Sequence, residues 1–358
     1  MNMTERIKQL AALERRATSK RIPPHERNNM KLKPSTKPRE NRRKFSTPAA
    51  PANIQFKTIL TTTDFSDASR CGVRYAVALA EKLGAAVALL HVIEPRTWVS
   101  ELGSIGPVRE DSGVVASARA QLATLAKRES KGEVAVTFSV VLRSGNPFDA
   151  ITTAAREHAA ELVVIATHGH TGVDRVLLGS TAERVVRHAS CPVLTVPTRA
   201  KPKRAGKAPV FRLKKILVPM DFSGISKDAL PWATFLAARF GAEVILLHVV
   251  EKFPIDYLLG GGLMNEMFVP LMKQAEADLE GIAGGWSKST GVKISATVRK
   301  GSPYEAICEA AKTLDADMIV LTTHGHTGLK KVWLGSTAER VVRHAPCPVL
   351  AVRELNRK

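Results

Sequence analysis

The chain has 358 residues, of which 44% are hydrophobic and 24% charged, as is usual for a globular protein of about two domains. No apolar run approaches the roughly 20 residues that span a bilayer, which excludes a transmembrane segment. The net charge of +20 is unevenly placed: residues 1–50 hold 14 Lys or Arg against four Glu, and residues 198–215 hold eight and no acid. The rest of the chain is therefore close to neutral.

These two basic stretches predict a tail at residues 1–55 and a linker at residues 198–210. The tail is rich in proline and poor in apolar side chains, so we expect it to be mostly disordered. A polyanion such as nucleic acid is one candidate partner for this charge, and a solvated linker is the simpler interpretation. The four cysteines have no C-x-x-C spacing, which favours reduced thiols and a cytoplasmic location.

An internal repeat dominates the rest of the chain. Thr-His-Gly-His-Thr-Gly occurs at Thr167–Gly172 and again at Thr323–Gly328, and Gly-Ser-Thr-Ala-Glu-Arg-Val-Val-Arg-His-Ala occurs at Gly179–Ala189 and Gly335–Ala345. The repeat is domain-sized, far longer than the 20–50 residues of solenoid units. The sequence therefore predicts two similar domains, repeat 1 at residues 56–197 and repeat 2 at residues 211–354.

Strands and helices are predicted to alternate along each repeat. In repeat 1 the expected elements are a strand at Ile59–Thr63, a helix at Ser66–Leu83 that Ser66 caps and Gly84 stops, a strand at Val87–Ile93, a helix at Asp111–Lys131, a strand at Val134–Leu142, a helix at Phe148–Ala159, and strands at Leu162–Thr167 and Val193–Val196. In repeat 2 the expected strands are Ile216–Met220, Val244–Val250, Lys293–Arg299, Met318–Thr323 and Val349–Val352. This alternation favours an α/β fold with two tandem, doubly wound, five-stranded parallel sheets.

The joint after the fourth strand carries the clearest chemical signal. In repeat 1 a buried strand leads into a loop with Gly169 and then into Gly179, Ser180 and Thr181, where a helix is expected to begin. Glycine lets the backbone approach a phosphate, and a helix N-terminus receives its charge. Asp64 would lie on the same rim, at the end of the first strand. Repeat 2 has the same pattern in Gly325, Gly335, Ser336 and Thr337.

A purely structural interpretation competes with phosphate binding at this joint. Ser180 and Glu183 fit a capping box, in which each side chain satisfies a backbone donor at the helix start. From the chemistry alone the two interpretations are equally good. The neighbouring pair His168 and His170 has two imidazoles but no further ligands in the pattern, so no metal site is predicted.

Five motifs recur in the two repeats: Asp-Phe-Ser after strand one, Leu-Leu-His-Val in strand two, Thr-His-Gly-His-Thr-Gly, Leu-Gly-Ser-Thr-Ala-Glu-Arg-Val, and Cys-Pro-Val-Leu at strand five. In combination, they resemble the universal stress protein family. The resemblance covers both repeats and implies an adenine nucleotide alpha hydrolase-like fold. It also implies that the fifth strands pair, here between the two repeats, with a homodimer as a further option. ATP, with Mg or Mn on its phosphates, is the implied ligand.

The nucleotide-binding branch of that family has Gly-x2-Gly-x9-Gly-Ser/Thr around the phosphates. The last two glycines match in both repeats, but Ala166 and Thr322 replace the first. The alanine adds one methyl group, whereas the β-branched threonine hinders close approach of a ligand. The residues implied on the adenine side are Asp64 and Val92 in repeat 1 and Pro219, Asp221 and Val249 in repeat 2. The resemblance therefore implies binding in at least one repeat.

Three functions follow as alternatives. The first is a stress-response module that binds ATP and whose occupancy alters an interaction or a signal. The second is a slow ATPase, for which no general base or Walker lysine is found and no catalytic residue is assigned. The third is a nucleotide-free scaffold. The segments Pro95–Gly113 and Pro254–Pro270 differ most between the repeats, and a lid or docking role competes there with a plain variable loop.

Overall fold

The computed structural model describes residues 54–94, 97–99, 105–107, 112–130, 136–167, 178–197, 212–224, 226–251, 262–323 and 335–353. Apart from residues 54 and 55, the predicted basic tail and linker lie outside these ranges, so their partners stay predictions. None of the helices in the described ranges is long and apolar enough to cross a membrane.

Both repeats contain the predicted alternation. Repeat 1 consists of β1 (Thr58–Thr62), α2 (Asp67–Leu83), β2 (Ala86–Ile93), β3 (Thr97–Val99), β4 (Ile105–Pro107), α3 (Ser112–Glu129), β5 (Phe138–Ser144), α4 (Pro147–Glu157), β6 (Leu162–Ala166), α5 (Ser180–His188) and β7 (Val193–Val196). Repeat 2 consists of β8 (Lys215–Met220), the 3-10 turn η1 (Ser226–Asp228), α6 (Ala229–Phe240), β9 (Glu243–Val250), α7 (Gly262–Thr290), β10 (Ile294–Lys300), α8 (Pro303–Thr313), β11 (Met318–Thr322), α9 (Ser336–His344) and β12 (Val349–Val352).

Local sequence signals explain several boundaries. Ser66 caps α2 by accepting a hydrogen bond from Ser69 N, and Gly84 ends it in the left-handed region at φ 69°, both as predicted. One strand is shifted: β5 begins at Phe138 rather than Val134 and runs to Ser144. Pairing with β2 explains the shift, since residues 138–144 are those that pair in register with Val87–Ile93.

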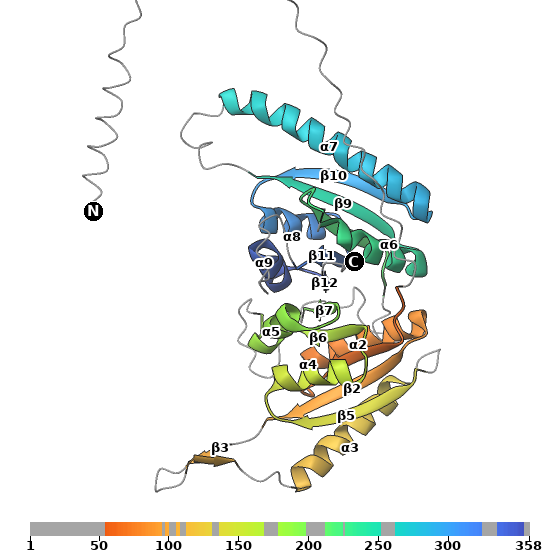
Figure 1. The fold of residues 1–358 in the computed structure, drawn as a ribbon, viewed down its shortest axis with the longest axis vertical. Helices are drawn as coiled ribbons and strands as arrows, with labels where there is room; N and C mark the ends of the chain where they lie inside the picture. Colours follow the sequence, from red (N-terminus) through yellow and green to blue (C-terminus); the bar gives the residue numbers. More distant parts are fainter. Residues whose placement is uncertain are drawn as a thin grey trace, which may run out of the picture. The chain divides into compact units, whose positions relative to one another are not determined.

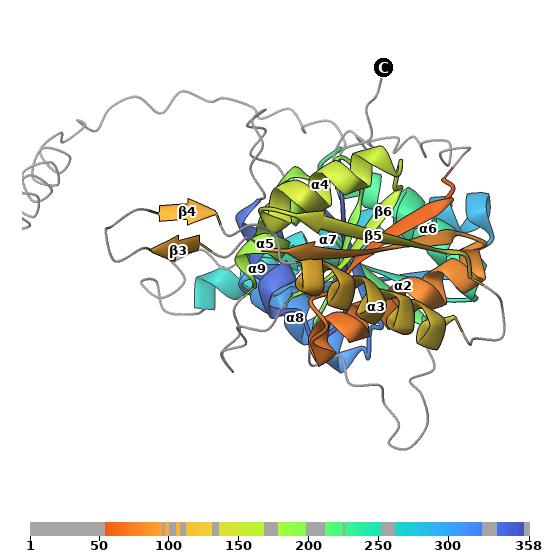
Figure 2. The ribbon, with the colours of Figure 1, turned by 90° about the horizontal axis from the view of Figure 1, so that it is seen from below.

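Five strands from each repeat form one ten-stranded sheet (Figure 1), which does not include β3 and β4. Its order is β10-β9-β8-β11-β12-β7-β6-β1-β2-β5, so each half has the predicted doubly wound order. Within this sheet all pairs inside a repeat are parallel, whereas β3 and β4 of repeat 1 form a separate antiparallel pair. One hydrophobic core lies under α2, α3, α6 and α7, and a second lies under α4, α5, α8 and α9. Figure 2 shows this layering in repeat 1, with α4 on one side of the sheet and α2 and α3 on the other.

The two repeats pair through their fifth strands, as the resemblance implied. β7 and β12 are antiparallel, and Leu194 lies opposite Leu350. Both leucines are buried, with exposed fractions of 0% and 2%. In the core under α2 and α6, Phe56 of repeat 1 packs against Trp232 and Phe235 of repeat 2. The ring centroids are 5.7 and 5.8 Å apart. The repeats therefore share both cores.

The phenol of Tyr75 on α2 is expected to make the stability of the protein depend on pH in the alkaline range. Burial raises the pKa of Tyr75 from 10.0 to about 12, and Cys71 and the repeat 2 residues Cys347 and Asp317 add smaller increases. Because the unfolded chain ionises first, stability is intact below about pH 10 and falls as the pH rises from there toward 12. We expect Tyr75→Phe to flatten this fall in urea midpoints between pH 9 and 11. An unchanged slope would mean that the phenol does not ionise differently on unfolding.

Candidate functional site

The strand order reverses between β1 and β6, which are adjacent and parallel. After β1 the chain enters α2 over one core, and after β6 it leads to α5 over the other. Connections that diverge from neighbouring strands leave a crevice at their carboxyl ends. β8 and β11 make the same arrangement in repeat 2. Most of the sequence-predicted site residues lie along these two edges.

The aspartates after the first strands are held by the turns that follow them. Asp64 Oδ1 accepts hydrogen bonds from Ser66 N at 3.0 Å and from Ser66 Oγ at 2.6 Å. In repeat 2 Asp221 Oδ1 accepts from Ser223 N at 2.9 Å. Both carboxylates are half-buried. The turn therefore fixes the position of each carboxylate on the rim before any ligand arrives.

The residue after each aspartate has an unusual backbone. Phe65 has φ 65° and Phe222 has φ 61°, a region that bulky side chains rarely adopt. Each ring lies 4.4 Å, centroid to centroid, from a histidine of the next strand, His91 or His248. Strain of this kind persists only where surrounding structure enforces it, often at functional sites. Because the same unusual backbone occurs at the same position of both repeats, this turn is a candidate part of the site.

His91 and His248 are half-buried, and each ring is bonded to the main chain. His91 Nδ1 lies 2.8 Å from Thr63 O, and His248 Nδ1 lies 2.7 Å from a main-chain carbonyl oxygen. A carbonyl oxygen only accepts, so Nδ1 carries a proton and donates in each of these contacts.

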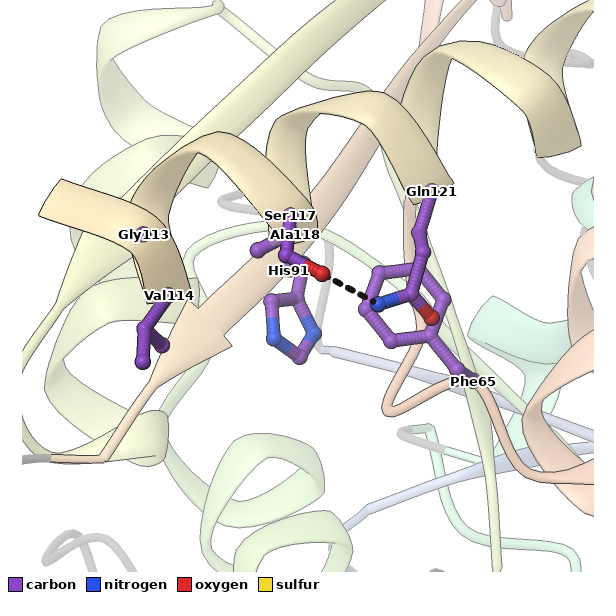
Figure 3. A pocket seen from close by; sticks show the side chains of 7 residues that line it. All are labelled: Phe65, His91, Gly113, Val114, Ser117, Ala118 and Gln121. Carbon is purple, nitrogen blue, oxygen red and sulfur yellow. Dashed lines mark hydrogen bonds between the residues drawn. The ribbon is translucent and has the colours of Figure 1, made fainter.

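A cleft of about 380 Å³ opens beside this ring pair in repeat 1 (Figure 3). It is lined by Phe65, His91, Gly113, Val114, Ser117, Ala118 and Gln121. Phe65 packs against the core under α2 and α3, whereas Val92 packs against the core under α4 and α5. Since successive strand residues point to opposite faces, the cleft and the Val92 side chain lie on opposite sides of the sheet edge.

The glycine before α5 lies in close contact with the end of β6. Gly179 N donates to Thr167 O at 2.8 Å, and a Cβ added at Gly179 would lie 3.2 Å from the same oxygen. In repeat 2 Gly335 N donates to Thr323 O, also at 2.8 Å. Both glycines are N-caps in an extended conformation, with φ −60° and −57°. Neither glycine is needed for a positive φ, and at Gly179 the close approach of the strand end is what disfavours a side chain.

The capping-box interpretation of this joint is wrong. Ser180 and Ser336 are the first helical residues, not the N-caps, and neither helix start has a side-chain cap hydrogen bond. Glu183 bonds to an arginine one turn later instead of reaching back to the cap. The serines are exposed, and Thr181 and Thr337 are half-buried. The serine hydroxyls are therefore not used to cap the helices.

The remaining predicted residues divide into two groups. Val92 and Val249 are half-buried near the ends of β2 and β9, and Pro219 pairs with Leu247. Gly169 and Gly325, with the histidine-containing loops around them, lie outside the described residues. The structure therefore places the helix-start half of each predicted phosphate site but not the loop half.

Gly72 lies against the end of β6, a contact that the sequence analysis missed. It is buried in α2, and a Cβ there would lie 3.5 Å from Ala166 N and 3.9 Å from Ala166 Cβ. An added Cβ would thus be in ordinary van der Waals contact with the end of β6, where Ala166 replaces the first family glycine. A glycine inside a helix costs about 1 kcal/mol relative to alanine, which was the available signal of close packing.

The sequence profile of the universal stress protein family matches residues 55–197 and again residues 212–353. The chain belongs to this family. Universal stress protein MJ0531 of Methanocaldococcus jannaschii is 38% identical over 144 residues, covering 39% of this chain and 82% of that protein. A universal stress protein of Mycolicibacterium smegmatis is 28% identical over 302 residues, covering 82% of this chain and 96% of that protein.

The fold has a close counterpart among solved structures. A universal stress protein from Archaeoglobus fulgidus has a TM-score of 0.60 and 22% sequence identity, and the match covers 86% of this chain and 100% of that chain. At this identity the likeness shows the fold alone. The chain is thus a tandem universal stress protein whose two domains share one sheet.

Proposed function

We propose that this protein is a stress-response module that binds ATP at the carboxyl edge of its sheet. The observation that carries the proposal is the start of α5. Gly179 lies so close to Thr167 O that a side chain there would crowd the strand end, and Ser180 follows with its hydroxyl not used as a cap. Backbone donors, a close approach and hydroxyl groups together fit a phosphate group. Repeat 2 has the same helix start.

Each predicted residue has a distinct role in this proposal. The N–H groups in the first turn of α5 would hold the phosphates, and the hydroxyls of Ser180 and Thr181 would donate further hydrogen bonds. Gly169 would let the loop approach the same phosphates. Asp64 and Val92 would contact the adenine or ribose side. In repeat 2 the corresponding residues are Gly325, Gly335, Ser336, Thr337, Pro219, Asp221 and Val249.

The phosphates of ATP would place a concentrated negative charge beside the backbone N–H groups and hydroxyls of this site. A divalent metal, Mg or Mn, would bind to its phosphate oxygens rather than to a protein cage, because hard cations prefer such oxygens. No described residue is assigned the role of general base, so we propose binding rather than turnover. Occupancy would then alter an interaction of the protein.

A nucleotide-free scaffold is the second candidate function, and one observation favours it. Thr322 stands where the family pattern has its first glycine, at the end of β11, and is 9% exposed. Its branched side chain would narrow the space through which a ligand reaches the proposed site of repeat 2. The continuous sheet through β7 and β12 would then be the functional feature.

Release of bound nucleotide tests the proposal. The purified protein is denatured, and the released small molecules are identified by chromatography and mass spectrometry. We expect ATP or ADP at up to two per chain, or an upward thermal shift when ATP is added to nucleotide-free protein. An empty protein that also gives no shift with millimolar ATP would favour the scaffold.

A further inference from the structure

Four charged side chains form a closed ring between the two repeats. Arg187 lies 2.8 Å from Glu183 of its own helix and 3.6 Å from Glu339 of repeat 2. Arg343 lies 3.0 Å from Glu339 and 3.5 Å from Glu183 of repeat 1. Each carboxylate therefore faces one arginine from its own repeat and one from the other. We call these four residues the charge ring.

The charge ring joins the two helices that begin at the proposed phosphate sites. α5 and α9 lie side by side at the junction (Figure 1, Figure 2). A second contact strengthens this tie: Arg353, after β12, donates from Nη2 to Arg187 O at 2.8 Å. A cation is favourable there, near the carboxyl end of α5.

The two glutamates belong to the first turns of their helices, and their carboxylates extend toward the arginines one turn later. Glu183 N donates to Gly179 O at 3.0 Å, and Glu339 N donates to Gly335 O at 2.9 Å, so each glutamate is one turn into its helix. A negative side chain in the first turn is attracted by the helix dipole and repels another anion at the same end. Without neutralisation these glutamates would oppose a phosphate.

Partial burial makes the neutralisation effective. The four side chains are 23–30% exposed, so solvent and salt screen them less than they screen a surface pair. The ring holds two positive and two negative charges. Removing one arginine leaves the charge ring with a net negative charge. This charge would act on the starts of both helices, including the one in the other repeat.

We infer that each proposed nucleotide site is completed by the other repeat: Arg343 is a positioning residue for the site of repeat 1, and Arg187 is one for the site of repeat 2. This inference rests on the proposed function. Its consequence is that the two sites are electrostatically coupled through α5 and α9. The coupling needs the β7–β12 pairing, which brings residues 160 positions apart into contact.

The test uses the full chain with one site silenced. In a Gly335→Val parent, ATP binding by repeat 1 is measured at low salt for Arg343→Ala, for Arg343→Lys, and for Arg343→Ala combined with Glu183→Gln. We expect Arg343→Ala to weaken binding about threefold to tenfold, because a charge near a helix terminus has an effect of that size. Arg343→Lys should retain most of the affinity, and Glu183→Gln should restore the loss.

The Glu183→Gln rescue separates neutralisation from a merely structural tie. If the ring only held the repeats together, removing a second charged partner would not restore binding. The reciprocal set uses a Gly179→Val parent with Arg187→Ala and Glu339→Gln. Unchanged affinity in both arginine-to-alanine variants, or a loss that Gln does not relieve, would overturn the inference alone. If neither parent binds ATP, the proposed function and the inference fall together.

Discussion

Gly179→Val is expected to lower the affinity of repeat 1 for ATP by about tenfold to hundredfold, because overpacking of a close contact costs 1–3 kcal/mol. The added Cβ would lie 3.2 Å from Thr167 O, so the helix start or the strand end must move. Valine is also a poor N-cap, which weakens the first turn that would hold the phosphates. Equilibrium dialysis with radiolabelled ATP measures the effect.

A matched control is available in α7. Gly281 has no atom within 4 Å of an added Cβ, so Gly281→Val tests the same substitution in open space. We expect it to leave ATP binding unchanged. If Gly179→Val bound ATP as tightly as the wild type, the start of α5 would not be a phosphate site.

The second large effect is expected at the junction of the repeats. Leu350→Asp places a carboxylate opposite Leu194, in the middle of the β7–β12 pairing. Burial of an unpaired charge destabilises by several kcal/mol, so we expect about 4 kcal/mol or more to be lost from the free energy of unfolding. Urea unfolding followed by circular dichroism should then show a lower midpoint and a second transition, as the repeats unfold separately.

Leu271→Asp is the matched control for this variant. Leu271 is 52% exposed on α7, so the same substitution there should change the free energy of unfolding by no more than about 0.5 kcal/mol. Equal effects of the two substitutions would show that the junction is not a buried interface in solution.

Most of the fold could be predicted from the sequence because the signals are local. Ser66 and Gly84 bound α2 through short-range capping, and the apolar run at Val193–Val196 is the observed β7. The edge strand β5 was placed too early, because its bounds depend on pairing with β2 rather than on its own composition.

The site was less predictable because its decisive contacts are not local. The start of α5 fits a capping box in sequence, but the hydrogen bond from Gly179 N to Thr167 O makes the glycine the cap. The sequence pattern for Glu183 and Arg187 indicates only a helical i,i+4 pair. Their second partners come from repeat 2 and follow from the antiparallel register of β7 and β12. No spacing within one repeat contains that information.

The most direct test of nucleotide binding is an isothermal titration of nucleotide-free full-length protein with ATP. The predicted result is saturable binding at one or two sites per chain, weakened at least about tenfold in the double variant Gly179→Val and Gly335→Val but not in Gly281→Val. Absence of binding at millimolar ATP, or undiminished binding in the double variant, would contradict a nucleotide site at the starts of α5 and α9.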